Sequence, residues 1–223
     1  MFDYKGLKFP DDPRLMGERM QQLISSGRYE REEQTGLPRF IKPDARVVEL
    51  GGGIGLISGL TCKLGVSHMT TVEANPMLAA YIERLHGAND FTNTQVINAV
   101  ALPHAQAQAA GASMPFYVTR PFWSSSLVEP KRKKYRITQV PVVSLEEILT
   151  RAEANTLICD IEGGEAQLFD GLDVASLRHI YLEMHTKKMG AEAVRHIFSH
   201  LHTAGFTYDE TVSNGPVVLF SRL

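Results

Sequence analysis

Apolar residues follow two periodicities along this chain, one typical of buried strands and one typical of helices. Short apolar runs bounded by turn residues predict parallel strands buried on both faces. These runs cover residues 47–50, 68–73, 94–100, 156–160, 180–184, 206–208 and 217–220. Helical spacing follows most of them, from Leu56, from Pro76, over 144–149 and over 191–204. The pattern predicts an α/β fold: a doubly wound, Rossmann-like sheet of about seven strands with an antiparallel edge.

Two segments depart from this alternation. Residues 1–42 carry apolar residues at helical spacing and predict an N-terminal helical cap. Residues 101–142 contain an Ala/Gln-rich stretch at 106–111, for which we expect a turn, and strand patterns on its C-terminal side. Long connections in a compact fold often contact substrate, so we expect a hairpin-like, substrate-side insertion here. We predict a single domain over residues 1–223 that includes both segments.

Composition narrows the class of protein. The formal net charge is −2, from 23 basic and 25 acidic residues, which provides no bulk attraction to nucleic acid or to a membrane. Cys62 and Cys159 fall in a helix and a strand pattern and fit small core residues in a reducing compartment. No run of eighteen apolar residues and no signal segment is present. We therefore expect a cytoplasmic enzyme with no membrane partner and no nucleic-acid partner. The sequence does not decide whether the protein forms a homo-oligomer.

The first predicted strand leads into three alternating glycines, Gly51, Gly53 and Gly55. Glycines at this spacing let the backbone turn sharply and approach a ligand, and the helix that follows points its N-terminus at the same place. About twenty residues further on, Glu73 ends the second strand, where a carboxylate can accept both hydroxyls of a ribose. The dinucleotide pattern needs a further glycine where Leu56 stands, and no phosphate-loop Lys follows the turn.

An acidic residue, Glu49, stands two positions before the first of these glycines. A carboxylate there suits a cofactor that carries an ammonium group rather than a pyrophosphate. The pattern Glu-x-Gly-x-Gly-x-Gly resembles motif I of the class I S-adenosylmethionine methyltransferases. We therefore expect S-adenosyl-L-methionine as the cofactor.

Later motifs are similar to those of the FkbM methyltransferase family and occur in the same order. They are Tyr29-Glu30 after a glycine, residues 72–76, 98–100 and 143–145, Ser124 to Leu127, and Asp160-Ile161-Glu162-Gly163-Gly164-Glu165. Glu49 stands where the family more often has aspartate, and Gly164 where it more often has alanine. The resemblance implies methyl transfer, mostly to a hydroxyl oxygen of a small molecule or a sugar, but it does not fix the acceptor.

Eight residues are expected to contact the cofactor. The glycine motif and the strand ends predict most of them, and Glu30 is added by the family resemblance. The eight are Glu30, Glu49, Gly51, Gly53, Glu73, Asn75, Asn98 and Ala99.

Four further residues form the predicted catalytic group, because they lie at or just beyond the carboxyl ends of two strands. Asp160 and Glu162 follow one strand, and Glu183 and His185 follow another. A hydroxyl acceptor needs a base within hydrogen-bond reach, and either a carboxylate or His185 can serve. The same four side chains could gather a divalent cation, but no tight ligand spacing supports one and we predict no metal site.

The acceptor is expected to contact the insertion through Trp123, Ser124 and Ser125. Lys131 to Lys134 form a basic run, best explained as a solvated hairpin tip. The leading hypothesis is O-methylation of a small molecule or sugar. Methylation of an amine or of RNA, and a non-catalytic cofactor-binding or partner-binding domain, remain as alternatives.

Overall fold

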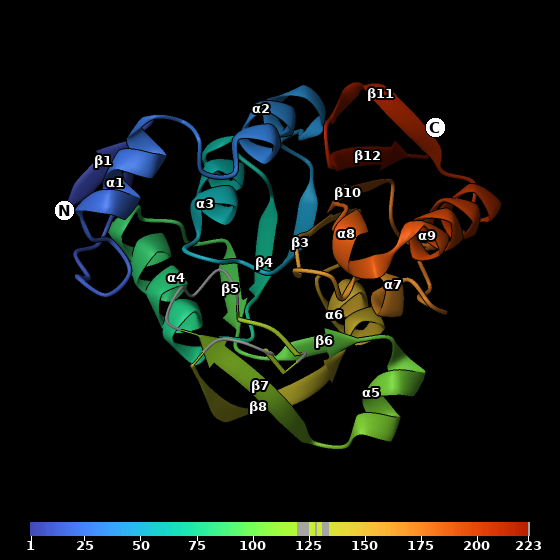
Figure 1. Cartoon of the computed structure of the whole chain (residues 1–223). Coiled ribbons are helices and arrows are strands. Elements are labelled where there is room, and N and C mark those ends of the chain that lie inside the picture. Colours follow the sequence, from blue (N-terminus) through green and yellow to red (C-terminus); the bar gives the residue numbers. More distant parts are fainter. Residues whose placement is uncertain (120–124, 128, 131–133, 223) are drawn as a thin grey trace.

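The computed structural model describes residues 1–119, 125–127, 129–130 and 134–222. Its centre is a seven-stranded sheet in the order β11-β12-β10-β9-β3-β4-β5 (Figure 1). The strands are β3 (Arg46–Leu50), β4 (His68–Val72), β5 (Thr94–Ile97), β9 (Thr156–Cys159), β10 (His179–Glu183), β11 (Thr207–Asn214) and β12 (Val217–Ser221). Strands β5, β4, β3, β9 and β10 are parallel, whereas β12 runs antiparallel to β10 and to β11. The predicted doubly wound sheet with an antiparallel edge is confirmed.

Helices cover both faces of this sheet, because alternate strand residues point to opposite sides. Val48 belongs to the core beneath α6 (Leu145–Arg151), α7 (Glu165–Leu168) and α9 (Ala191–Thr203). Val47 belongs to the core beneath α2 (Arg31–Phe40) and α3 (Leu56–Lys63). Helix α4 (Pro76–Ala88) connects β4 to β5, and the four-residue α8 (Thr186–Met189) follows β10.

The N-terminal segment contains strands as well as helices. A hairpin of β1 (Phe2–Tyr4) and β2 (Leu7–Phe9) precedes α1 (Glu18–Ser25) and α2. Leu7, Phe9 and Ile24 pack into a core shared with α4. Strands of three residues show too little alternation to be predicted from the sequence, so the hairpin was not expected.

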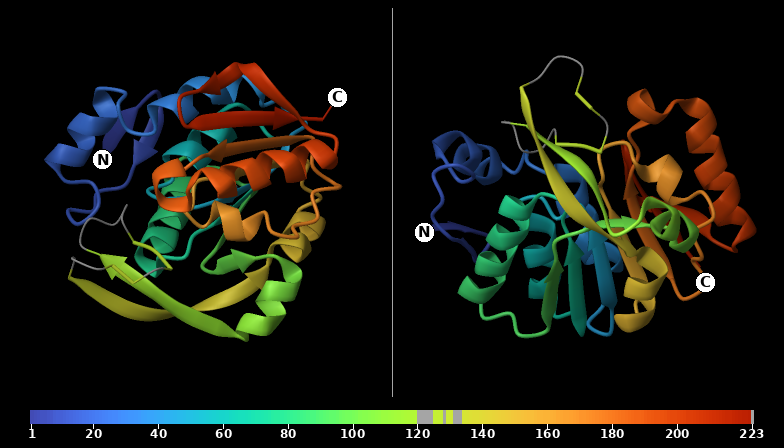
Figure 2. Two further views of the ribbon diagram at one scale, coloured as in Figure 1. Left: turned by 45° about the vertical axis from the view of Figure 1, so that its right-hand side comes forward. Right: turned by 90° about the horizontal axis from the view of Figure 1, so that it is seen from below.

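The insertion forms a second, smaller sheet at one end of the molecule (Figure 2). Its order is β6-β8-β7, with β6 (Val100–Leu102), β7 (Ser113–Thr119) and β8 (Tyr135–Ser144). The expected turn at 106–111 is wrong: α5 (His104–Ala110) occupies most of it, because alanine and glutamine favour helix until Gly111 ends it. The predicted third strand is divided, with β5 and β6 lying in different sheets.

No helix within the described ranges is long and apolar enough to cross a membrane.

Candidate active site

The glycine loop between β3 and α3 adopts the conformation for which glycine is suited. Gly51 and Gly53 have φ angles of 83° and 55°. A Cβ atom on residue 51 would lie 1.7 Å from the carbonyl oxygen of Asp160, so no side chain fits there. The amide of Gly51 donates to the carbonyl of Val72 at 3.0 Å, which joins the loop to the end of β4.

Glu73 lies directly beneath this loop. Its Oε2 accepts a hydrogen bond from the amide of Gly53 at 3.0 Å, and its Oε1 accepts one from the amide of Asn75 at 2.7 Å. Burial raises the pKa of Glu73 to about 7, although these hydrogen bonds oppose the shift. The two predicted contact points for the cofactor, the glycine loop and Glu73, are therefore adjacent.

Three other predicted cofactor residues surround the ends of β4 and β5. Asn75 caps α4, with Oδ1 accepting from the amide of Met77, while its buried Nδ2 has no partner. Asn98 donates through Nδ2 to the carbonyls of Glu73 and Ala74 at 2.8 and 3.0 Å. Ala99 packs into the main core, so only its backbone is available to a ligand.

Tyr29 and Glu30 lie over the glycine loop from the other side. A Cβ atom on Gly53 would be 3.3 Å from the Tyr29 hydroxyl and 3.5 Å from Oε1 of Glu30. Glu30 begins α2 with a left-handed φ of 48°, which aims its carboxyl inward. Burial, followed by the charge of Glu33, raises the pKa of Glu30 well above its ordinary value.

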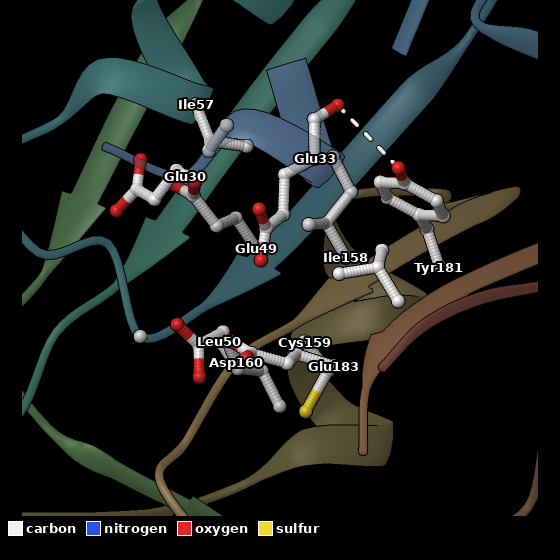
Figure 3. Close-up of a pocket in the computed structure, with 12 residues that line it drawn as sticks. Glu30, Glu33, Glu49, Leu50, Ile57, Ile158, Cys159, Asp160, Tyr181 and Glu183 are labelled. Carbon is white, nitrogen blue, oxygen red and sulfur yellow. Dashed lines mark hydrogen bonds between the residues drawn. The ribbon is translucent and has the colours of Figure 1, made fainter. Parts of the chain in front are cut away.

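A pocket opens between the loop and the ends of β9 and β10 (Figure 3). Among the residues that the structure describes, twelve line this pocket; five of these are acidic and none is lysine, arginine or histidine. Buried oxygens of three of these acids, Glu30 Oε2, Glu49 Oε2 and Asp160 Oδ1, have no hydrogen-bond partner. The lining residues are Glu30, Glu33, Glu49, Leu50, Gly51, Ile57, Ile158, Cys159, Asp160, Tyr181, Glu183 and Val217.

The structure brings the four predicted catalytic residues together at one side of this pocket. Nε2 of His185 lies 3.5 Å from a carboxylate oxygen of Glu162, 3.7 Å from one of Asp160 and 3.9 Å from one of Glu183. Lys188 pairs with Glu162 on the outer side of the cluster. The imidazole is thus enclosed by carboxylates.

Proton affinities in this cluster depart from their ordinary values. Burial, with the charges of Glu183 and Glu162, raises the pKa of Asp160 to about 8. Burial alone would lower the pKa of His185, but the hydrogen bond and charge of Glu165, with the other carboxylates, raise it to about 9. These shifts favour the charged form of His185, and Asp160 binds its proton more tightly than an exposed aspartate does.

Two acidic residues in the site were not assigned to it from the sequence. Glu33, on α2, is 7% exposed and offers an oxygen within 4.8 Å of oxygens from Asp160 and Glu183. Glu165 is fully buried, and its Oε1 accepts from Nδ1 of His185 at 2.9 Å. For Glu33, the only sequence feature that points to the site is its position one helical turn after Glu30. Glu165 has the sequence pattern of an ordinary acidic residue in the first turn of a helix.

Two groups of three side chains here have the spacing of metal ligands: Asp160 with Glu162 and His185, and Glu33 with Asp160 and Glu183. Acidic clusters of this kind also occur without an ion, so the expectation of no metal site stays a prediction.

The predicted acceptor contacts are only partly described. Trp123 and Ser124 lie outside the described residues, as does most of the basic run. Ser125 accepts a hydrogen bond from the amide of Thr119 at 3.1 Å and so helps to hold the small sheet. It does not line the pocket described above.

The seven-stranded sheet with one reversed strand, and the glycine loop above its centre, define a class I methyltransferase fold. The family model of the FkbM methyltransferase domain matches residues 59–208, well over half of the chain. The protein belongs to this family of methyltransferases.

Solved structures of methyltransferases align with this chain at low identity. Magnesium protoporphyrin IX methyltransferase from Synechocystis PCC 6803, a structure with bound S-adenosylmethionine, aligns with a TM-score of 0.51 and 13% identity, covering 91% of this chain and 83% of that one. Precorrin-6y C5,15-methyltransferase from Geobacter metallireducens GS-15 aligns with a TM-score of 0.49 and 10% identity, covering 97% and 95%. A sequence comparison with curated proteins found no match. These identities show the fold alone.

Proposed function

We propose that this methyltransferase uses S-adenosyl-L-methionine to methylate a hydroxyl group of a small molecule or a sugar. The observation that carries the cofactor is Glu49: it is 2% exposed, lines the pocket, and has a buried Oε2 without a partner. A buried carboxylate of this kind is costly unless a cation or a donor meets it. The ammonium group of the cofactor supplies both a charge and hydrogen-bond donors.

The remaining predicted cofactor residues fit the same ligand. Glu30 offers a second unpartnered buried oxygen on the opposite side of the glycine loop. We assign Glu73, whose Oε2 accepts from the amide of Gly53, to the hydroxyls of the ribose. The unpartnered Nδ2 of Asn75 adds a donor near that point. When bound, the cofactor supplies an electrophilic methyl group; the protein's part is alignment and exclusion of water.

The residues around Asp160 supply the proton chemistry. A hydroxyl is a weak nucleophile at neutral pH, so its proton must pass to a base as the oxygen forms its bond to the methyl carbon. Asp160 and His185 are both candidates by position, 3.7 Å apart. Because the pKa of Asp160 is raised, its ionised carboxylate is a stronger base than an exposed carboxylate.

Calorimetry tests the proposal. We expect S-adenosylmethionine and S-adenosylhomocysteine to bind with micromolar affinity and NAD not to bind. Asp160→Asn should retain cofactor binding and lose methyl transfer. If neither sulfur compound binds, the cofactor assignment fails and a partner-binding role moves ahead.

A second candidate is methylation of an amine, and the charge of the pocket favours it. Glu33, Asp160 and Glu183 are acidic groups beyond those that the cofactor would neutralise, and no described residue lining the pocket is basic. A protonated amine would be attracted to such a site. Assays that pair amino sugars and amino alcohols with their neutral hydroxyl counterparts, with mass spectrometry of the products, separate the two acceptor classes by the methylated atom.

A further inference from the structure

Glu165 makes an ordered set of contacts that the proposed reaction does not yet use. Its side chain is fully buried at the start of α7. Its Oε1 accepts from the amide of Gly163 at 3.1 Å, from the amide of Ile161 at 3.4 Å, and from Nδ1 of His185 at 2.9 Å. The turn that holds these amides is tight, with Glu162 at a φ of 60° and Gly163 at 106°. The carboxylate is therefore fixed by the backbone before it meets the imidazole.

The contact with Glu165 fixes the orientation of the His185 ring. Since Nδ1 faces Glu165, the opposite nitrogen, Nε2, faces the pocket side. There it lies within 4 Å of Glu162, Asp160 and Glu183. Two further ionisable groups face the cluster: Glu33 approaches Asp160 and Glu183 from α2, and Lys188 is bound to Glu162. Carboxylates on both sides favour a ring with protons on both nitrogens.

We propose that Glu165 is a positioning residue that holds His185 as an imidazolium, with its Nε2–H directed at the pocket carboxylates. His185 then donates a hydrogen bond to the site and does not act as its base. The proton of the acceptor hydroxyl passes to the carboxylate of Asp160 as the new oxygen–carbon bond forms and the sulfur–carbon bond of the cofactor breaks. Asp160 later returns the proton to water. The catalytic meaning of this arrangement rests on the proposed function.

The pKa values of the two partners agree with this geometry. The pKa of Glu165 is lowered: burial opposes the shift, but the hydrogen bond from His185, the backbone amides and the charge of His185 together outweigh burial. The pKa of His185 is raised to about 9. Each partner thus favours the charged form of the other.

Nuclear magnetic resonance of the imidazole nitrogens tests the proposal without cofactor or acceptor. The His185 signals are assigned by their loss in His185→Gln. In the unsubstituted protein we expect them to show an imidazolium up to at least pH 8. Glu165→Gln keeps the size of the side chain but removes its charge, and should lower the pH of the transition by at least about one unit. Glu165→Asp should restore part of the shift.

Glu162→Gln is the matched control, because Glu162 also faces His185 but lies 3.5 Å from Nε2 without a short hydrogen bond. It should shift the transition less than Glu165→Gln does. If His185 of the unsubstituted protein loses its imidazolium proton near pH 6.5, the proposal is overturned. This measurement needs no variant, so it decides the matter even if Glu165→Gln does not fold. An unchanged transition in a folded Glu165→Gln protein overturns it as well. If the calorimetric test fails, the cofactor assignment is wrong, but the protonation state of His185 measured by nuclear magnetic resonance is unaffected.

Discussion

The α-carbon of Gly51 packs against the carbonyl oxygen of Asp160, so closely that a Cβ on residue 51 would lie 1.7 Å from that oxygen. This contact joins the glycine loop after β3 to the turn after β9, two segments more than one hundred residues apart in the sequence. It sets the spacing between the proposed cofactor site and the proposed base. A side chain added at residue 51 should therefore disturb both, whereas a change confined to the Asp160 side chain leaves this backbone contact in place.

Gly51→Ala should lower the free energy of unfolding by roughly 2–5 kcal/mol, because it adds a clash with backbone to an unfavourable φ of 83°. Chemical denaturation measures the loss. Gly65→Ala is the matched control: residue 65 has a φ of 81°, but nothing lies within 4 Å of an added Cβ. It should cost only about 1 kcal/mol. Equal losses would mean that the contact with Asp160 is not decisive.

Glu49→Gln should weaken binding of S-adenosylmethionine by at least about tenfold, since it removes the charge that faces the ammonium group. Calorimetry measures this affinity. The exposed Glu83→Gln, on α4, is the control and should bind as the unsubstituted protein does. Unchanged affinity in Glu49→Gln would place the ammonium group elsewhere.

The stability of Glu49→Gln should also depend on pH in a defined way. Burial raises the pKa of Glu49 to about 8, so the folded state holds this proton more tightly than the unfolded state. Between pH 5 and 8 the group therefore makes the ligand-free protein progressively less stable. Glutamine cannot titrate, and the stability of the variant relative to the parent should rise over that range. A constant difference between the two proteins would contradict the raised pKa.

The ligand-free protein as a whole should lose thermal stability from about pH 5.5 to pH 9. The raised pKa values of Glu33, Glu73 and Asp160, at about 7, 7 and 8, mean that each group binds more protons when folded. His185, with its pKa raised to about 9, contributes stability below its unfolded pKa and loses it as pH rises through 9. We expect a fall in Tm of at least about 5 °C.

Scanning fluorimetry at several pH values measures this fall. Saturating S-adenosylmethionine should reduce it, because a cationic ligand favours the ionised carboxyls. A Tm that rises across the interval, or that falls equally with and without the cofactor, would contradict the prediction.

Tyr181→Phe should loosen the helix that carries Glu30 and Glu33. The Tyr181 hydroxyl donates to the carbonyl of Glu32 at 3.0 Å and to that of Glu33 at 3.4 Å, the second contact being drawn in Figure 3. These bonds tie α2 to β10. Its loss should lower the free energy of unfolding by about 1–2 kcal/mol and weaken cofactor binding.

Tyr208→Phe provides the comparison, because Tyr208 is 45% exposed and should change neither quantity. Denaturation and calorimetry on both variants decide the point. If Tyr181→Phe binds the cofactor normally, α2 does not need this tie for the site.

The parts of the site that the sequence could predict are those carried by local order. Glu49 and the glycines after it occupy a strand, a turn and a helix start within a few residues, and periodicity identifies all three. Asp160 and Glu183 could be grouped without knowing their contacts, because parallel strands end at the same edge of a sheet.

Other parts depend on tertiary packing, which periodicity does not contain. Glu33 reaches the pocket only because α2 packs over the sheet, and its residues alone suggest a solvated helix face. The pairing of Glu165 with His185 joins the start of α7 to the residue before α8, twenty positions further along the chain. The turn predicted at residues 106–111 was wrong for a different reason. Helix α5 contains good helix formers but has too few residues to show a helical period.

The small sheet has a core of its own, formed by Val100, Leu102, Phe116 and Val140. The polypeptide leaves the small sheet at Ser144, which is the last residue of β8. Ser144 is also the N-cap of α6, and its hydroxyl accepts from the amide of Glu147. Among the residues that the structure describes, most of the segment between β6 and Ser144 therefore packs on this small core, while Val143 at its end reaches the core of the central sheet. Substitutions confined to the small core can accordingly accumulate over evolution while the glycine loop and the turn at Asp160 keep their places.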